Sequence, residues 1–282
     1  MKYLQILAIV ILCASCASTS TDQTIDLQGK WLEKHGADVK NVNTRQDNSE
    51  MIPQMPQAFR YNGFQIINDR YDNYTGFQEV VSDSSGGRSL KYYGHLTDYR
   101  LSGDSLEIYN PITKKYYLKG VLDVQNDDSV ILVKRGDSTR YERQIIENYE
   151  NFDRIELDAS RCFGTCPNFS ISISQKGDIN FEGKAYTPLK GKYVSQASFP
   201  LVDYVFSKFE QQPILKYQDR YEDGGTDQQT ITLRFYQAGK LVKTIEDYGT
   251  ASPQELLWAI QPLKNLYLRD ELNWERIQKE NN

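Results

Sequence analysis

The chain has 282 residues, of which 39% are hydrophobic, and 33 lysines and arginines stand against 38 aspartates and glutamates. A chain of this length predicts two domains, because a domain usually takes about 100–200 residues. The formal net charge is −5 and the basic residues are scattered, so the chain has no basic field that would attract nucleic acid. We therefore expect no nucleic-acid partner.

The first residues have the layout of a secretory signal peptide. Lys2 supplies a positive start, residues 3–12 form an apolar run with one polar interruption, and the small residues Ala14 and Ser15 stand before Cys16. A helix that crosses a membrane needs about 20 apolar residues, and this run is too short for that. We therefore expect an exported protein.

A cysteine directly after two small residues resembles the bacterial lipobox, in which the cysteine is acylated and becomes the new N-terminus. The resemblance implies a signal peptide over residues 1–15, a palmitate-type lipid on Cys16 and a flexible tether over 16–26. Several acyl chains anchor stably, whereas a single chain holds only marginally. Ala17 replaces the aspartate that retains some lipoproteins at the inner membrane, which favours the outer one. The alternative is an ordinary cleaved signal peptide, and surface exposure stays open.

The first domain, residues 27–146, reads as a series of short strands. Runs rich in aromatic and β-branched residues alternate with Gly, Asn, Asp and Pro turns. We expect strands over 64–67, 77–81, 91–94, 99–101, 106–109, 116–121, 130–134 and 140–143. The segment 36–57 has little periodicity and is expected to be a loop. Strands at this spacing predict an antiparallel sandwich or up-and-down barrel.

The beginning of this domain carries a resemblance to a family. Gly29-Lys30-Trp31 resembles the G-x-W opening of lipocalins and their bacterial relatives, and the pattern over 99–109 is similar to the bacterial relatives too. The resemblance implies an antiparallel barrel, with Gly29 and Trp31 in a structural motif at its floor. A barrel of this size is either packed or holds one small apolar ligand, and the sequence leaves both open.

Residues 153–270 form the second expected domain, after a polar boundary near 147–151. Alternating apolar residues predict strands and hairpins, and apolar residues at helical spacing predict one helix from Ser198 and another up to Tyr267. Ser252-Pro253-Gln254-Glu255 has the pattern of a capping box with proline at the first helical position. The order β-β-β-α-β-β-α predicts an α+β domain with both helices on one face of the sheet, followed by a polar tail over 271–282.

This second half resembles an uncharacterised domain family of bacterial envelope proteins. Residues 162–167 fit the C-x-G-x-C-P stretch of that family, and residues 177–183 fit its D-G-x-v-x-y-x-G hairpin, with Lys176-Gly177 in place of D-G. The resemblance covers residues 153–267 and implies no activity.

The cysteines give the sharpest local signal in the chain. Cys13 leaves with the signal peptide and Cys16 takes lipid, so Cys162 and Cys166 remain as an even pair in an oxidising compartment. We expect a disulfide that shapes the loop between two strands. A reactive dithiol and a metal site are the alternatives, although Arg161 is the only nearby cation and no histidine is close in sequence.

The remaining polar residues define one further candidate, a long acidic and Gly-rich loop before a strand. Its residues Asp219, Glu222, Asp223 and Asp227 could bind a ligand or Ca²⁺ through oxygen atoms, and a solvated turn is the alternative. His35 is expected in a loop and His95 in a strand. Without a G-x-S-x-G elbow we assign no catalytic residue, and we expect no cofactor and no metal.

These features predict a non-enzymatic lipoprotein of the cell envelope that acts in binding or assembly. Its expected partners are the membrane, through the lipid anchor, and a small apolar ligand or an envelope protein. The rival hypothesis is a thiol-redox or small hydrolytic enzyme that uses the loop of Cys162 and Cys166. A purely structural envelope component is the third hypothesis.

Overall fold

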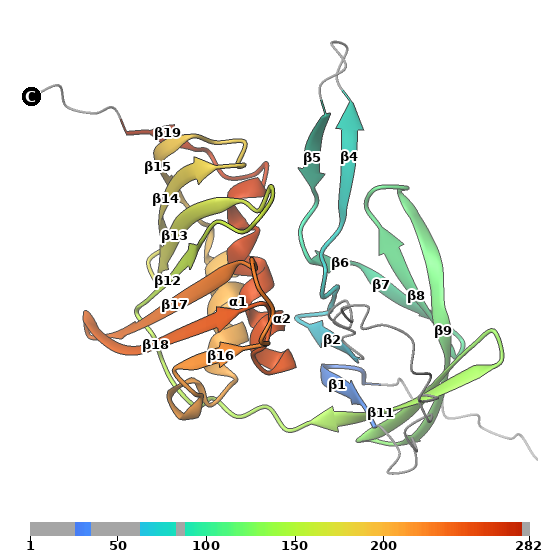
Figure 1. Ribbon diagram of the computed structural model, residues 1–282. Helices are drawn as coiled ribbons and strands as arrows, with labels where there is room; N and C mark the ends of the chain where they lie inside the picture. Colours follow the sequence, from blue (N-terminus) through green and yellow to red (C-terminus); the bar gives the residue numbers. More distant parts are fainter. Residues whose placement is uncertain (1–25, 35–62, 83–87, 278–282) are drawn as a thin grey trace, which may run out of the picture.

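The computed structural model describes residues 26–34, 63–82 and 88–277, and it shows two domains joined by an extended linker (Figure 1). Cys16, His35 and the loop predicted over 36–57 lie outside the described residues. Within the described ranges, no helix is long and apolar enough to cross a membrane.

The N-terminal domain is an antiparallel sheet of nine strands that curves into a near-closed barrel. The strands lie in the order β6-β3-β2-β1-β11-β10-β9-β8-β7. Their bounds are β1 (Gly29–Glu33), β2 (Gly63–Ile67), β3 (Arg70–Asp72), β6 (Leu96–Thr97), β7 (Tyr99–Ser102), β8 (Ser105–Asn110), β9 (Lys115–Asn126), β10 (Ser129–Lys134) and β11 (Asp137–Gln144). β4 (Gln78–Ser82) and β5 (Arg88–Tyr92) form a separate hairpin. The predicted antiparallel barrel-like domain is confirmed.

One side-chain contact links the two ends of this sheet. The Tyr109 amide donates to the carbonyl of Asp98 at 2.9 Å, which continues the antiparallel β7–β8 pair by one position. The Thr97 hydroxyl of β6 donates to the carbonyl of Tyr109 in β8 at 2.9 Å. The edge strands β6 and β7 are not neighbours in the sheet, so the barrel stays near-closed.

Aromatic side chains fill the inner face of the barrel. Trp31 is 1% exposed and its ring lies 6.0 Å from that of Phe64, which also contacts Tyr71 and Tyr141. The Trp31 indole N–H donates to the carbonyl of Leu27 at 2.9 Å, which satisfies its one polar group. The structure thus places the tryptophan of the G-x-W motif inside the core.

The C-terminal domain has an eight-stranded sheet in the order β16-β18-β17-β12-β13-β14-β15-β19. Its elements are β12 (Arg154–Ala159), β13 (Asn168–Ser174), β14 (Asp178–Ala185), β15 (Gly191–Gln196), α1 (Phe199–Glu210), η1 (Ile214–Lys216), β16 (Arg220–Glu222), β17 (Thr230–Gln237), β18 (Lys240–Tyr248), α2 (Gln254–Lys264), η2 (Leu266–Leu268) and β19 (Glu275–Arg276). The predicted α+β class is confirmed, and β15, β16 and β19 extend the predicted order. β16 pairs in parallel with β18, while the other pairs of this sheet are antiparallel.

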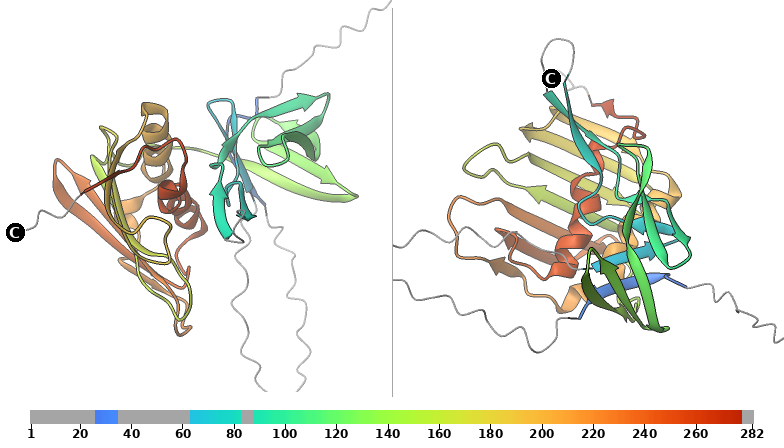
Figure 2. Two further views of the ribbon diagram at one scale, coloured as in Figure 1. Left: turned by 90° about the horizontal axis from the view of Figure 1, so that it is seen from above. Right: turned by 90° about the vertical axis from the view of Figure 1, so that its right-hand side faces the viewer.

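Both helices lie on one face of this sheet, between the sheet and the barrel (Figure 2). Val205 and Phe209 of α1 and Leu256 and Leu263 of α2 are fully buried in one apolar cluster with the sheet residues. A helix in the middle of three layers needs a second contact face, because its other side meets the barrel. That second face carries polar as well as aromatic residues.

The start of α2 differs from the expected capping box. The N-cap is Pro253, which makes no side-chain capping bond. Instead the Asp247 carboxylate, at the end of β18, accepts the amides of Ala251 and Ser252 at 2.7 and 2.9 Å. These two amides precede α2, so Asp247 orders the turn before the helix and does not cap the helix itself. The predicted capping box, with proline at the first helical position, is therefore wrong.

Candidate functional site

The two domains meet around a buried ion pair. Lys208 of α1 pairs with Asp72 of β3, and their side chains are 4% and 0% exposed. Lys208 Nζ also donates to Gln65 Oε1 at 2.6 Å, and the Tyr204 hydroxyl donates to Asp72 Oδ1 at 3.0 Å. Burial lowers the pKa of the Lys208 ammonium, and the Asp72 carboxylate opposes this shift.

Local structure explains why these four groups converge. Tyr204 and Lys208 lie one helical turn apart, so they share the face of α1 that points away from the sheet. Gln65 and Asp72 are directly opposite each other in the β2–β3 pair. A buried ion pair is strongly destabilising when one partner is removed, so this cluster couples the two domains energetically.

A second part of the interface contains His95. This residue is 0% exposed and lies at a bend just before β6, not in the strand that the sequence predicted. Its Nδ1 lies 2.8 Å from the carbonyl of Asn73, and its ring lies 5.6 Å from the ring of Tyr92. Burial lowers the pKa of His95 to about 4, so the imidazole is neutral at pH 7. Tyr92 in turn forms a backbone bridge with Arg269 of the other domain.

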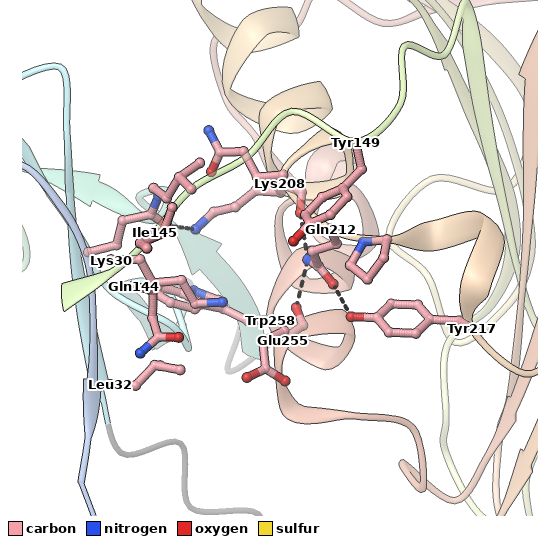
Figure 3. A pocket seen from close by; sticks show the side chains of 14 residues that line it. Lys30, Leu32, Gln144, Ile145, Tyr149, Lys208, Gln212, Tyr217, Glu255 and Trp258 are labelled. Atoms are coloured by element: carbon pink, nitrogen blue, oxygen red, sulfur yellow. Dashed lines mark hydrogen bonds between the residues drawn. The ribbon is translucent and has the colours of Figure 1, made fainter. Parts of the chain in front are cut away.

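Beside the ion pair, a pocket of about 240 Å³ opens between the domains (Figure 3). The barrel contributes Lys30, Leu32, Gln65 and Gln144, and the linker contributes Ile145, Ile146 and Tyr149. The helical layer contributes residues that include Lys208, Gln212, Tyr217, Glu255 and Trp258. The linker is held against the end of α1, since the Tyr149 amide donates to the carbonyl of Glu210 at 2.9 Å. Both domains are needed to form this pocket.

Trp258 is the aromatic surface between the two lysines of the pocket. Lys208 Nζ lies 3.8 Å from the centroid of its ring and Lys30 Nζ lies 5.5 Å from it. Tryptophan is the best aromatic partner for a cation, because its ring face is electron-rich. The indole is 2% exposed in total, so it is fixed in place.

Gln212 makes one wall of the pocket rigid. Its amide N–H groups donate to the carbonyls of Lys208 at 2.6 Å and Glu255 at 3.0 Å. Its Oε1 accepts from the Tyr217 hydroxyl at 3.0 Å, as the dashed lines in Figure 3 show. This single side chain therefore joins the ends of α1 and η1 to the first turn of α2.

Lys30 is the cation of the pocket that has no ion-pair partner within the described ranges of the chain. Burial lowers its pKa to about 8; the charges of Glu255 and Asp72 oppose this shift, and that of Lys208 adds to it. Lys208 differs, because it already pairs with Asp72 and donates to Gln65. The pocket thus offers the Lys30 ammonium, apolar side chains and amide groups, which suits binding of a small polar molecule with an anionic group.

The structure brings the two predicted loops together, but away from the pocket. Cys162 and Cys166 form the predicted disulfide, with Cα atoms 5.7 Å apart. The amide of Phe163 inside that loop donates to the carbonyl of Asp227 at 2.9 Å. Neither loop contributes a residue to the pocket lining.

The acidic loop has mostly local partners. Asp219 pairs with Lys243 and Glu222 pairs with Arg220. Asp223 accepts the amide of Gly225 at 2.8 Å and the side-chain amide of Gln228 at 2.7 Å. Over the described ranges, no three His, Cys, Asp or Glu side chains are grouped as a metal would require.

Few local sequence patterns predict the residues of the pocket. Lys30 is the variable residue of the G-x-W motif, and Trp258 falls within the apolar pattern of a helix. A surface position explains the first and burial in the core explains the second, so neither pattern points to a binding site. The helix of Lys208 also contains Asp203, Ser207 and Glu210, so the sequence does not mark Lys208 as a buried residue. Its partner Asp72 lies in a strand of three residues that has no recognisable pattern.

Comparison with known proteins identifies the second domain. Residues 153–267 match the family model described as "Domain of unknown function (DUF6438)", so this part of the chain is a domain of that family. The family description names no activity. No curated protein and no solved structure matches the chain.

Proposed function

We propose that the protein is a non-enzymatic binding protein of the cell envelope that holds a small anionic molecule in the pocket between its two domains. The observation that supports this most is Lys30, a largely buried ammonium that faces the pocket and forms no ion pair within the described ranges. Burying a charge without a partner is costly, so an anion bound at Lys30 would offset that cost.

The size and walls of the pocket narrow the class of ligand. A volume of about 240 Å³ is below the roughly 300–1,000 Å³ of pockets for drug-sized ligands, so the ligand is a small metabolite. The apolar side chains of Leu32, Ile145 and Ile146 line the same pocket and would contact an apolar part of the ligand. Glu255 at the same pocket disfavours a second negative charge, so we expect one carboxylate or phosphate group per ligand.

The anchor is the second part of the proposal. An acylated Cys16 and the tether over residues 16–26 would hold the domain pair at a membrane, with the outer membrane as the favoured location. The lipocalin-like relationship of the barrel, with a small apolar ligand inside it, stays a separate prediction. The pocket between the domains has more support, because its charged and aromatic groups are positioned by residues of both domains.

The binding proposal is tested by calorimetric titration of the full-length protein with acetate, succinate, inorganic phosphate and glucose as probes. We expect an anion to bind and Lys30→Met to weaken it by roughly ten- to a hundredfold, the usual loss for a hydrogen bond to a charged group. Lys115→Met, an exposed lysine on β9, is the matched control and should bind like the wild type. Equal binding by both variants, or a preference for glucose, would contradict the proposal.

The anchor is tested by the intact mass of protein purified from its native envelope. A chain that begins at Cys16 and carries a lipid-sized mass increment is the expected result. A chain that begins elsewhere, or an unmodified Cys16, would refute the anchor and leave the binding pocket unaffected.

A further inference from the structure

Phe163 projects from the C-terminal domain at the tip of the disulfide loop. Its side chain is 88% exposed, although phenylalanine is among the residues most often buried. The loop is short, because Cys162 and Cys166 close it covalently. A large apolar side chain at the tip of a closed loop is a feature that packing inside the domain does not explain.

The backbone of this loop is held rigidly. The Phe163 amide donates to the carbonyl of Asp227 at 2.9 Å, and the Gly164 amide donates to the carbonyl of Cys162 at 3.0 Å. Gly164 has a φ of +148°, a conformation that a residue with a side chain rarely adopts. The disulfide, the tight turn and the bond to the neighbouring loop therefore fix the direction in which Phe163 points.

The base of the loop is fixed as well, on both sides. The side-chain amide of Gln229 donates to the carbonyls of Ser160 at 2.9 Å and Pro167 at 2.7 Å. The amide of Thr230 donates to the Ser160 hydroxyl at 2.8 Å, and Asn168 donates to the carbonyl of Ala159 at 2.7 Å. Binding through such a loop loses little conformational entropy, because the loop is already ordered.

The surroundings of Phe163 are acidic. Asp227, whose carbonyl holds the loop, lies with Asp223 in an exposed segment, and both carboxylates have no basic partner within the described ranges. Glu222 next to them is paired with Arg220. Arg161 is the one exposed cation of the loop itself, so the net local charge is negative.

We propose that the Phe163 loop, residues 160–168, is a docking site for a protein partner. Phe163 enters an apolar socket of the partner, and lysine or arginine side chains at the rim of that socket face Asp223 and Asp227. Aromatic anchors that fill a pocket dominate the energetics of many interfaces. The acidic surroundings favour a protein over a membrane, because anionic lipid headgroups would repel the two carboxylates.

Site-specific photo-crosslinking in the native cell tests this proposal in the full-length protein. A benzophenone side chain replaces Phe163 in one variant and Phe199, which is 78% exposed at the start of α1, in the matched control. We expect one discrete protein adduct from position 163 and none of that mass from position 199.

Charge neutralisation then tests the predicted chemistry of the partner. Asp223→Asn with Asp227→Asn keeps the side-chain shape and tolerates the positive φ of residue 227. An amide at position 223 accepts only one of the two bonds from Gly225 and Gln228, so circular dichroism first checks that the variant keeps its fold. We expect this pair to lower the yield of the adduct roughly threefold to tenfold, as for exposed charge pairs. The exposed residues Asp203 and Asp270, changed to asparagine, should leave the yield unchanged.

Four results would overturn the proposal. They are equal adducts from both positions, no adduct from position 163, an adduct with lipid alone, and an adduct whose yield does not depend on Asp223 and Asp227. Each of them leaves ligand binding at the pocket untouched, because the loop and the pocket share no residue.

Discussion

Lys30→Met should make the folded protein more stable at neutral pH, although it removes the cation that we assign to ligand binding. Burial lowers the pKa of Lys30 from 10.5 to about 8, so the charged form of Lys30 is less stable in the folded state than in the unfolded chain. Methionine has a similar length and no charge, and it can pack against Trp258. A stabilising substitution at a residue that binds ligand is the usual trade-off between stability and function.

The magnitude follows from the shift in pKa. A pKa that falls from 10.5 to about 8 corresponds to about 3 kcal/mol, at about 1.4 kcal/mol for each tenfold change in proton affinity. Lys30 keeps some contact with solvent, which screens its charge, so we expect a gain of about 1–3 kcal/mol from Lys30→Met at pH 7.

The stability difference between the wild type and Lys30→Met depends on pH. Below pH 8 both states of the wild type carry the proton and the whole penalty is present. Between pH 8 and 10.5 the folded state has lost the proton while the unfolded chain keeps it, so the wild type gains stability relative to the variant as the pH rises. Tyrosines whose pKa is raised by burial affect both proteins equally and cancel in the difference.

Urea unfolding followed by tryptophan fluorescence measures this difference at about pH 7 and about pH 9.5. Lys115→Met is the control, because the same substitution on an exposed strand position should change stability by no more than about 0.5 kcal/mol. The reasoning is refuted if Lys30→Met is less stable than the wild type at pH 7. It is also refuted if the difference does not shrink as the pH rises.

Three further predictions concern the interface and the disulfide. Asp72→Asn leaves the buried ammonium of Lys208 without its anion and should lower the free energy of unfolding in urea by about 3–5 kcal/mol. The double variant Asp72→Asn with Lys208→Met should recover most of that loss. Equal stability of the single and double variants would contradict this. Burial holds the pKa of His95 at about 4, against 6.5 in the unfolded chain. The free energy of unfolding should therefore fall by up to about 3 kcal/mol as the pH drops from 6.5 to 4. His95→Gln should flatten this part of the plot of stability against pH. Replacing Cys162 and Cys166 by serine should lower the free energy of unfolding by about 2 kcal/mol, the entropic contribution of a five-residue loop. A variant that keeps full stability but loses a thiol-dependent activity would support the redox hypothesis instead.

Sequence patterns alone determined the elements that depend on local periodicity. The hairpins of the second domain follow from alternation of apolar and polar residues, as in Phe169-x-Ile171-x-Ile173, because one face of each strand must be buried. The apolar face of α1 and that of α2 follow from helical spacing in the same way. The disulfide was predictable too, because only two cysteines remain in the expected mature chain.

Short elements and local caps were beyond the sequence. β3 and β6 have three and two residues, too few for any period to show, and they exist because neighbouring strands pair with them. The turn before α2 is held by Asp247, which β18 brings beside it, and the expected side-chain cap of α2 is absent. In both cases a tertiary contact supplied what the local sequence did not specify.

The candidate site depends on contacts between the two domains. Lys208 and Gln65 are 143 positions apart in the sequence, yet they bond because the outward face of α1 docks on the barrel. Lys30 likewise meets Trp258 across the two domains. Periodicity reports which face of an element is buried against its own sheet, but it contains no information about a second layer on the opposite face. The sequence therefore determined the parts of each domain, and the packing of one domain on the other decided where the polar pocket lies.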